Sequence, residues 1–227
     1  MIDERLKYAA NYIIGDKMVD IGSDHAYLPI YAIQNEIVKS AICGEVVEGP
    51  YRSTMKNIDV YHMADKIDAR LGDGLKVLSK EDEVDTITIC GMGGPLIASI
   101  IEEGYSNVSG RPRLVLQANN FTHPIRKAVT DLNYTITHEK VLKTGKRYYE
   151  IMVCDYKEEK VSLTDKEMTF GPVNLTVRDE AFIGKVEWEH DHMVKIYNGI
   201  NSEKSSDKKE EIKSKIKMLE EVLNDED

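Results

Sequence analysis

Short strand-like runs alternate with helical runs along the first 132 residues, and this alternation limits the fold more than any other feature. Strands joined by helices at this spacing form crossover units, which build a parallel sheet with helices on both faces. The predicted strands are 18–21, 41–46, 66–71, 86–90 and 113–117. The predicted helices are 3–14, 26–35, 50–62, 74–79, 93–103 and 122–132.

The pattern changes after residue 133. Residues 134–156 hold two strand-like runs joined by the sequence KTGKR, whose glycine indicates a tight turn. A parallel sheet closed by an antiparallel hairpin is the late-strand pattern of class I methyltransferases, which use S-adenosylmethionine (SAM). We therefore predict an α/β fold with a Rossmann-like class I methyltransferase sheet.

The remaining residues are predicted to be helical. The sequence GPV at 171–173 is expected to open a long helical run, and apolar residues recur at helical spacing in 182–200 and 212–223. A polar connection at 201–207 separates the two stripes, which indicates a coiled-coil-like helical hairpin. The predicted domains are a SAM-binding domain at 1–158 and a helical domain at 159–227.

Charge and composition narrow the function classes. The net charge of −10 argues against a chain that is basic throughout, but the first 155 residues are nearly balanced and leave room for a local basic face. The three cysteines are far apart in apolar runs, which predicts reduced, buried thiols and no metal site. No run reaches the roughly 18 apolar residues of a membrane span, and we expect a cytoplasmic protein.

The segment VDIGSDHAYLPIYAI, at residues 19–33, places polar groups where a strand meets a helix. Gly22 allows a ligand to approach the backbone, and the start of the next helix favours an anion. Asp20 suits a cationic amino group. The segment therefore fits a zwitterionic amino-acid tail such as the methionine part of SAM.

Acidic residues also follow the next two strands. Glu45 lies about 20 residues after the glycine turn, where a carboxylate typically binds ribose hydroxyls. Asp73, between two glycines, suits the amino group of the cofactor's adenine. A solvated Glu45 and a plain turn at Asp73 remain alternatives. NAD is disfavoured, because the G-x-G-x-x-G fingerprint is missing and Asp24 would face its pyrophosphate.

Several segments together resemble one family. They are DIGSDHAYLPIYA, GEVVEGPYRSTMKNI, RLGDGLKVL, TITICGMGGPLIASII and LVLQANNFTHPIRKAV, with GKRYYEIMVCDY and FGPVNL further along. These segments look like those of the bacterial tRNA (adenine-N1)-methyltransferases that modify adenine 22. The resemblance covers most of residues 1–175. It implies a Rossmann-like SAM-binding domain, a coiled-coil-like C-terminal domain, SAM as methyl donor and tRNA as substrate.

The resemblance also implies roles for single residues. Asp24, His25 and Asn119 become the candidate catalytic residues. The family's Q-P-N is Gln117-Ala118-Asn119 in this chain, so the loop around Asn119 lacks the proline. With the acids considered above, the predicted cofactor-binding residues are Asp20, Gly22, Asp24, Glu45, Asp73, Gly74, Gly91, Met92 and Gly93.

Methylation of adenine N1 needs alignment, exclusion of water and stabilisation of the positive charge that develops on the base. Asp24 suits the last task, and Asn119 suits orientation of the base. His25 fits a general base, a stacking ring or a brace for the loop, and the sequence does not separate these roles.

The target adenine must leave the tRNA stack, which phosphate contacts help to offset. The predicted tRNA contacts are Arg126, Lys127, Lys143, Lys146 and Arg147. A small-molecule methyltransferase and a SAM-binding protein without catalysis remain alternative functions. The helical tail suits contact with tRNA or with a second protomer, and we expect a monomer or weak dimer.

Overall fold

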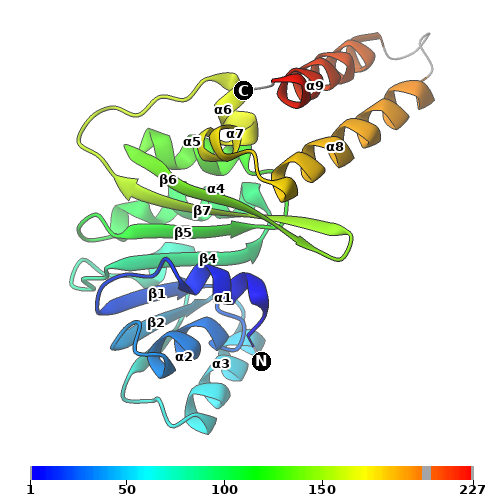
Figure 1. The fold of residues 1–227 in the computed structure, drawn as a ribbon. Coiled ribbons are helices and arrows are strands. Elements are labelled where there is room, and N and C mark those ends of the chain that lie inside the picture. The colour runs from blue at the N-terminus through cyan, green and yellow to red at the C-terminus, as the bar shows by residue number, and fades with distance from the viewer. Residues whose placement is uncertain (1, 201–205, 226–227) are drawn as a thin grey trace.

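The computed structural model describes residues 2–200 and 206–225. These residues form one seven-stranded sheet with the order β3-β2-β1-β4-β5-β7-β6, in which β7 runs antiparallel to β5 and β6 (Figure 1). The predicted fold class, a mostly parallel sheet closed by an antiparallel hairpin, is confirmed. The strands are β1 (Lys17–Ile21), β2 (Ser40–Glu45), β3 (Ile67–Leu71), β4 (Thr86–Met92), β5 (Arg113–Ala118), β6 (Tyr134–Thr144) and β7 (Arg147–Tyr156).

Helices cover both faces of the sheet, because alternate strand residues point to opposite sides. In β1, Met18 packs with the side that carries the first three helices, whereas Val19 and Ile21 pack with the other side. The predicted helix at 74–79 is only a short 3-10 turn, Gly74–Val77. The first face carries α1 (Glu4–Ala10), α2 (Tyr27–Gln34) and α3 (Glu48–Val60), and the second carries α4 (Gly94–Gly104) and α5 (His123–Asp131).

The C-terminal segment is helical but more broken than the sequence predicts. The expected long run from residue 171 is interrupted, because Arg178 adopts φ 49° and Asp179 begins a new helix by accepting a hydrogen bond from the Phe182 amide. The expected polar connection at 201–207 falls mostly on residues outside those described. The helices are α6 (Asp165–Phe170), α7 (Pro172–Val177), α8 (Glu180–Gly199) and α9 (Ser206–Asn224).

The apolar stripes of α8 and α9 pack on each other and on the hairpin. Phe182 and Val186 of α8 are buried with Leu219 and Val222 of α9, and Val141 of β6 joins the same cluster. The helical pair therefore sits against the sheet, at the upper right in Figure 1. Within the described residues, no helix combines the length and apolarity needed to cross a membrane.

Candidate active site

The loop after β1 has an unusual backbone. Gly22 has φ 69°, and the three residues Asp24, His25 and Ala26 have φ 35°, 73° and 55°. The left-handed conformation costs a residue with a side chain about 1–2 kcal/mol. Strain of this kind collects at ligand-binding sites, where the surrounding structure must hold it in place.

Glu45, at the end of β2, holds this loop. Its Oε1 accepts hydrogen bonds from Ser23 Oγ at 3.0 Å and from the Asp24 backbone N–H at 2.8 Å, and Glu45 is only 5% exposed. From α3, the Asn57 side chain donates to the His25 carbonyl at 2.8 Å. Nothing in the sequence indicates the contribution of Ser23 or Asn57, because both act through contacts that only the fold creates.

The side chains of Asp24 and His25 point outward from this anchored backbone. They are 84% and 41% exposed, and His25 Nε2 lies 3.6 Å from Asp24 Oδ1. The His25 ring centroid is 5.4 Å from that of Tyr27. No side chain caps the start of α2, and Tyr27 and Leu28 carry its first N–H groups, because the third residue is Pro29. An uncapped helix start favours an anion.

Asp20 lies beneath the loop and is 3% exposed. Thr88 Oγ1 donates a hydrogen bond to Asp20 Oδ1 at 2.5 Å. Burial, together with repulsion from Glu45, raises the pKa of Asp20 to about 7, although the Thr88 hydrogen bond acts in the opposite direction. A cationic group beside Asp20 would favour its ionised form.

We expect Asp20→Asn to increase the stability of the free protein more at pH 8 than at pH 5. The pKa of Asp20 is about 7 in the folded chain against 3.8 for an ordinary aspartate, so the folded state binds the proton more tightly. The wild type therefore loses stability as the pH rises from about 4 to about 7, whereas asparagine does not ionise. Thermal melts at both pH values measure this. An equal difference between variant and wild type at pH 5 and pH 8 would contradict it.

The loop after β4 packs against the loop after β1 and against the chain after β5. A Cβ added at Gly22 would lie 2.1 Å from the Met92 methyl group, and one at Gly94 would lie 1.8 Å from the Phe121 carbonyl oxygen. The Asn119 backbone N–H donates to the Met92 carbonyl at 2.8 Å. The structure thus brings the predicted site segments around Gly22, Met92 and Asn119 together.

Asn119 is held by a network that the sequence only partly indicates. Its Nδ2 donates to the Gly91 carbonyl at 2.7 Å, and its Oδ1 accepts from Gln117 Nε2 at 3.3 Å and from Arg5 Nη1 at 3.4 Å. The Arg5 guanidinium also lies 4.4 Å from the centroid of the Tyr149 ring. The sequence can indicate Gln117, because a glutamine near the end of an apolar strand is unusual. It cannot indicate Arg5, which lies on α1, far from Asn119 in the sequence.

Asp73 and Gly74 lie at the end of β3, to one side of these loops. The Asp73 carboxylate is 63% exposed and pairs with Lys76 Nζ at 2.7 Å. Gly74 is buried with φ 55°, and an added Cβ would come within 3.1 Å of Ile100. Gly74 therefore shapes the turn, whereas Asp73 presents its carboxylate at the surface.

The predicted basic contacts divide into two groups. Arg126 is fully buried between Glu139 and Glu150, so the prediction that it contacts tRNA is wrong: α5 directs it inward to two carboxylates. The other four predicted contacts, Lys127, Lys143, Lys146 and Arg147, are exposed.

The β6–β7 hairpin carries three of these exposed cations and extends beyond the carboxyl end of β5. The last pair between β5 and β7 is Ala118 with Glu150, and β7 begins three residues earlier, at Arg147. Residues 142–149 therefore project past the end of β5, at the same edge as the loops around Asn119. Lys143 Nζ lies 5.3 Å from the centroid of the Tyr148 ring.

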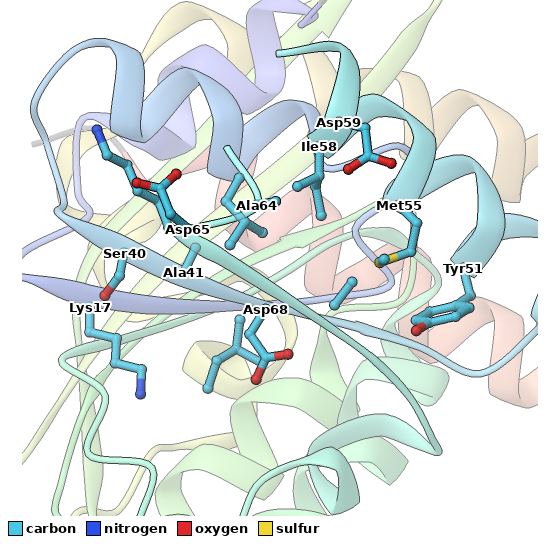
Figure 2. A pocket seen from close by; sticks show the side chains of 14 residues that line it. Lys17, Ser40, Ala41, Tyr51, Met55, Ile58, Asp59, Ala64, Asp65 and Asp68 are labelled. Carbon is cyan, nitrogen blue, oxygen red and sulfur yellow. The ribbon is translucent and has the colours of Figure 1, made fainter. Parts of the chain in front are cut away.

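Two cavities in the described part of the chain lie away from these loops. One, of about 490 Å³, is lined by Lys17, Ser40 and Ile67, which begin β1, β2 and β3, together with Met55 and Ile58 of α3 (Figure 2). Its lining comes mainly from the opposite end of the strands from the candidate site, so we assign it no role. In the described part of the chain, no group of three or more histidine, cysteine or acidic residues could hold a metal ion.

Comparison with known proteins identifies one family, both by a family model and by a relative of known name. The family model described as tRNA (adenine(22)-N(1))-methyltransferase, TrmK, matches residues 18–221. The Bacillus subtilis protein of that name is 36% identical, over 98% of this chain and 97% of its own.

Two solved structures are also similar over nearly the whole chain. A Streptococcus pneumoniae protein in complex with SAM is 36% identical with a TM-score of 0.89, covering 99% of this chain and 100% of its own. TrmK from M. capricolum, in complex with S-adenosyl-homocysteine, is 26% identical with a TM-score of 0.88, covering 99% of this chain and 98% of its own. The chain belongs to the tRNA (adenine(22)-N(1))-methyltransferase family.

Proposed function

We propose that this protein transfers a methyl group from SAM to N1 of adenine 22 in tRNA, the reaction that the family name describes. The observation that carries the proposal is the meeting of the loops after β1, β4 and β5 around the strained segment at Asp24 and His25. In open α/β sheets, ligands bind outside the carboxyl ends of the strands where the strand order reverses, and these loops lie there.

The residues at the carboxyl ends of these strands fit SAM. Gly22 lacks the side chain that would block close approach, the uncapped start of α2 favours the methionine carboxylate, and Asp20 favours the methionine ammonium group. SAM supplies an electrophilic methyl group on a sulfonium. We propose that the residues that hold it are Asp20, Gly22, Asp24, Glu45, Asp73, Gly74, Gly91, Met92 and Gly93.

Glu45→Ala is expected to weaken SAM binding by about 1–3 kcal/mol, because it removes a charged acceptor that orders the loop after β1. Glu45 Oε1 already receives the loop's hydrogen bonds, so we propose that Oε2 serves the ribose hydroxyls. Calorimetry measures the affinity. Glu48→Ala, at a 66% exposed carboxylate that pairs with Arg52, is the control. Equal SAM affinity in Glu45→Ala and wild type would show that the cofactor site is misplaced.

The proposed chemistry needs no strong base, because adenine N1 already carries a lone pair. Asp24 is proposed to stabilise the positive charge that develops on the base, and Asn119 to orient the ring. The Asn119 Oδ1 bonds from Arg5 and Gln117 are long, at 3.4 and 3.3 Å, so the adenine amino group can replace one of them. The proposal for His25 is a brace or stacking ring, given its position beside Tyr27.

The proposed tRNA contacts are the exposed cations. Lys143, Lys146 and Arg147 lie on the hairpin tip that projects past the candidate site, where they can meet phosphates beside the target base. Lys127 is a weaker candidate, because it already pairs with Asp131 at 2.5 Å.

The helical segment at 159–227 is proposed to act as a second domain that is fixed to the sheet. Lys185 of α8 lies 3.3 Å from Glu150 of β7, and Lys140 of β6 lies 2.7 Å from Asp179. We also propose that the protein acts in the cytoplasm, where the three free cysteines would stay reduced. The expected monomer or weak dimer stays a prediction, which sedimentation would measure.

Transfer of labelled methyl groups tests the proposed function. Purified protein is incubated with labelled SAM and either unmodified bulk tRNA or a mixture of nucleosides. We expect label in the tRNA and none in the nucleosides. Label in nucleosides alone would favour a small-molecule methyltransferase, and SAM binding without transfer to either would favour a non-catalytic protein.

A further inference from the structure

The loop that follows β5 is fixed at three points. At its start, the Asn119 backbone N–H donates to the Met92 carbonyl at 2.8 Å. In its middle, the Gly94 backbone N–H donates to the Asn120 carbonyl at 2.9 Å. At its end, Thr122 is 4% exposed and its Oγ1 donates to Glu150 Oε1 at 3.1 Å. The path of the chain through residues 119–122 is therefore set by its neighbours.

This anchored loop turns one aromatic side chain into solvent. Phe121 is 74% exposed, the highest value among the large apolar side chains that the structure describes as exposed. It also has φ 50°, a conformation that asparagine or glycine would adopt at lower cost. Neither burial nor backbone preference favours a phenylalanine here, and strained, exposed positions of this kind collect at binding sites, which makes the ring a candidate for binding.

The neighbours of Phe121 indicate what it binds. Asn119, a candidate catalytic residue, lies two positions before Phe121, and the Phe121 carbonyl oxygen touches the position that a Cβ of Gly94 would occupy. A flat, uncharged ring beside an RNA-modifying site suits the face of a nucleobase, because bases stack on aromatic side chains without regard to sequence.

We propose that Phe121 stacks on a tRNA base next to adenine 22 and fills the space that this adenine leaves when it enters the site. The exposure of the ring favours this role over contact with the reacting adenine itself, since a ring in the crevice wall would be more buried. The inference rests on the proposed function and adds a substrate-positioning residue to it.

The test uses a synthetic tRNA with 2-aminopurine in place of adenine 22, because 2-aminopurine becomes brighter when it leaves the base stack. Wild-type protein is expected to raise the fluorescence, and Phe121→Ala to lose most of that rise. With ordinary tRNA at saturation, Phe121→Ala should slow single-turnover methylation by about tenfold to a hundredfold, the range of base–aromatic stacking. Phe121→Tyr should retain both properties, whereas Phe121→Leu should lose them, because leucine has no aromatic face.

The matched control is Val60→Ala, which removes a side chain that is 61% exposed where α3 ends. This variant should behave as wild type, and all variants should bind SAM and melt as wild type does. Wild-type fluorescence and rate in Phe121→Ala, or full function in Phe121→Leu, would overturn the stacking role alone. Failure of the wild type to methylate tRNA would overturn the proposed function first.

Discussion

Arg126→Ala is expected to lower the free energy of unfolding by about 3–5 kcal/mol, because it removes the guanidinium that the buried Glu139 and Glu150 carboxylates share. Arg126 donates to Glu139 at 3.0 Å and to Glu150 at 2.8 Å. Its Nη1 also donates to the carbonyl oxygens of Met168 and Thr169, at 3.2 and 3.0 Å. One side chain therefore joins α5, the hairpin and α6, and its loss should loosen the helical segment from the sheet.

Urea unfolding measures this effect, and the neighbouring residue provides the control. Lys127 is exposed and pairs with Asp131 one turn away, so Lys127→Ala should change stability by less than about 0.5 kcal/mol. Equal unfolding midpoints for the two variants would contradict the structural role of Arg126. If Arg126→Ala instead unfolds at the wild-type urea midpoint but binds tRNA more weakly, Arg126 contacts phosphate, as the sequence predicts.

Asp24→Asn is expected to lower the single-turnover rate of methylation by about tenfold to a hundredfold, with saturating SAM and tRNA. The Asp24 carboxylate is proposed to act on a charge that exists only as the reaction proceeds, so the chemical step should suffer more than binding. Asparagine keeps the shape of the side chain and tolerates φ 35°, so the loop should stay intact.

Asn119→Ala serves as the comparison for this prediction. It removes the hydrogen bond to the Gly91 carbonyl and the proposed orientation of the base, and we expect a smaller loss of rate. Thermal melts accompany both variants to separate catalysis from folding. If both variants keep the wild-type single-turnover rate, the methyl-transfer site lies elsewhere on the chain.

The fold could be predicted because its signals are local. Strands such as Thr86–Met92 and Arg113–Ala118 are apolar runs between helical runs, and the hairpin turn carries Gly145. The broken C-terminal helices could not be predicted in the same way. Arg178 ends α7 in a left-handed conformation that its sequence neighbours do not require.

The candidate site is predictable only where a residue lies on a loop at the carboxyl end of a strand, because the strand order brings these loops together. Gly22, Met92 and Asn119 meet for that reason. The sequence places Arg126 wrongly among the tRNA contacts, because an arginine beside a lysine on a helix gives no sign that it is buried, and the two glutamates that hold it come from β6 and β7. Arg5 was missed because its contacts cross more than 100 positions of sequence.

Mapping the methylated nucleotide tests the central claim most directly. Unmodified tRNA is treated with the protein and SAM, and the product is read by primer extension, which stops at adenine methylated on N1 because that position pairs in the duplex. We predict a single new stop at adenine 22 that needs both protein and SAM. Transfer of methyl groups without that stop, or with stops at other bases, would contradict the assignment.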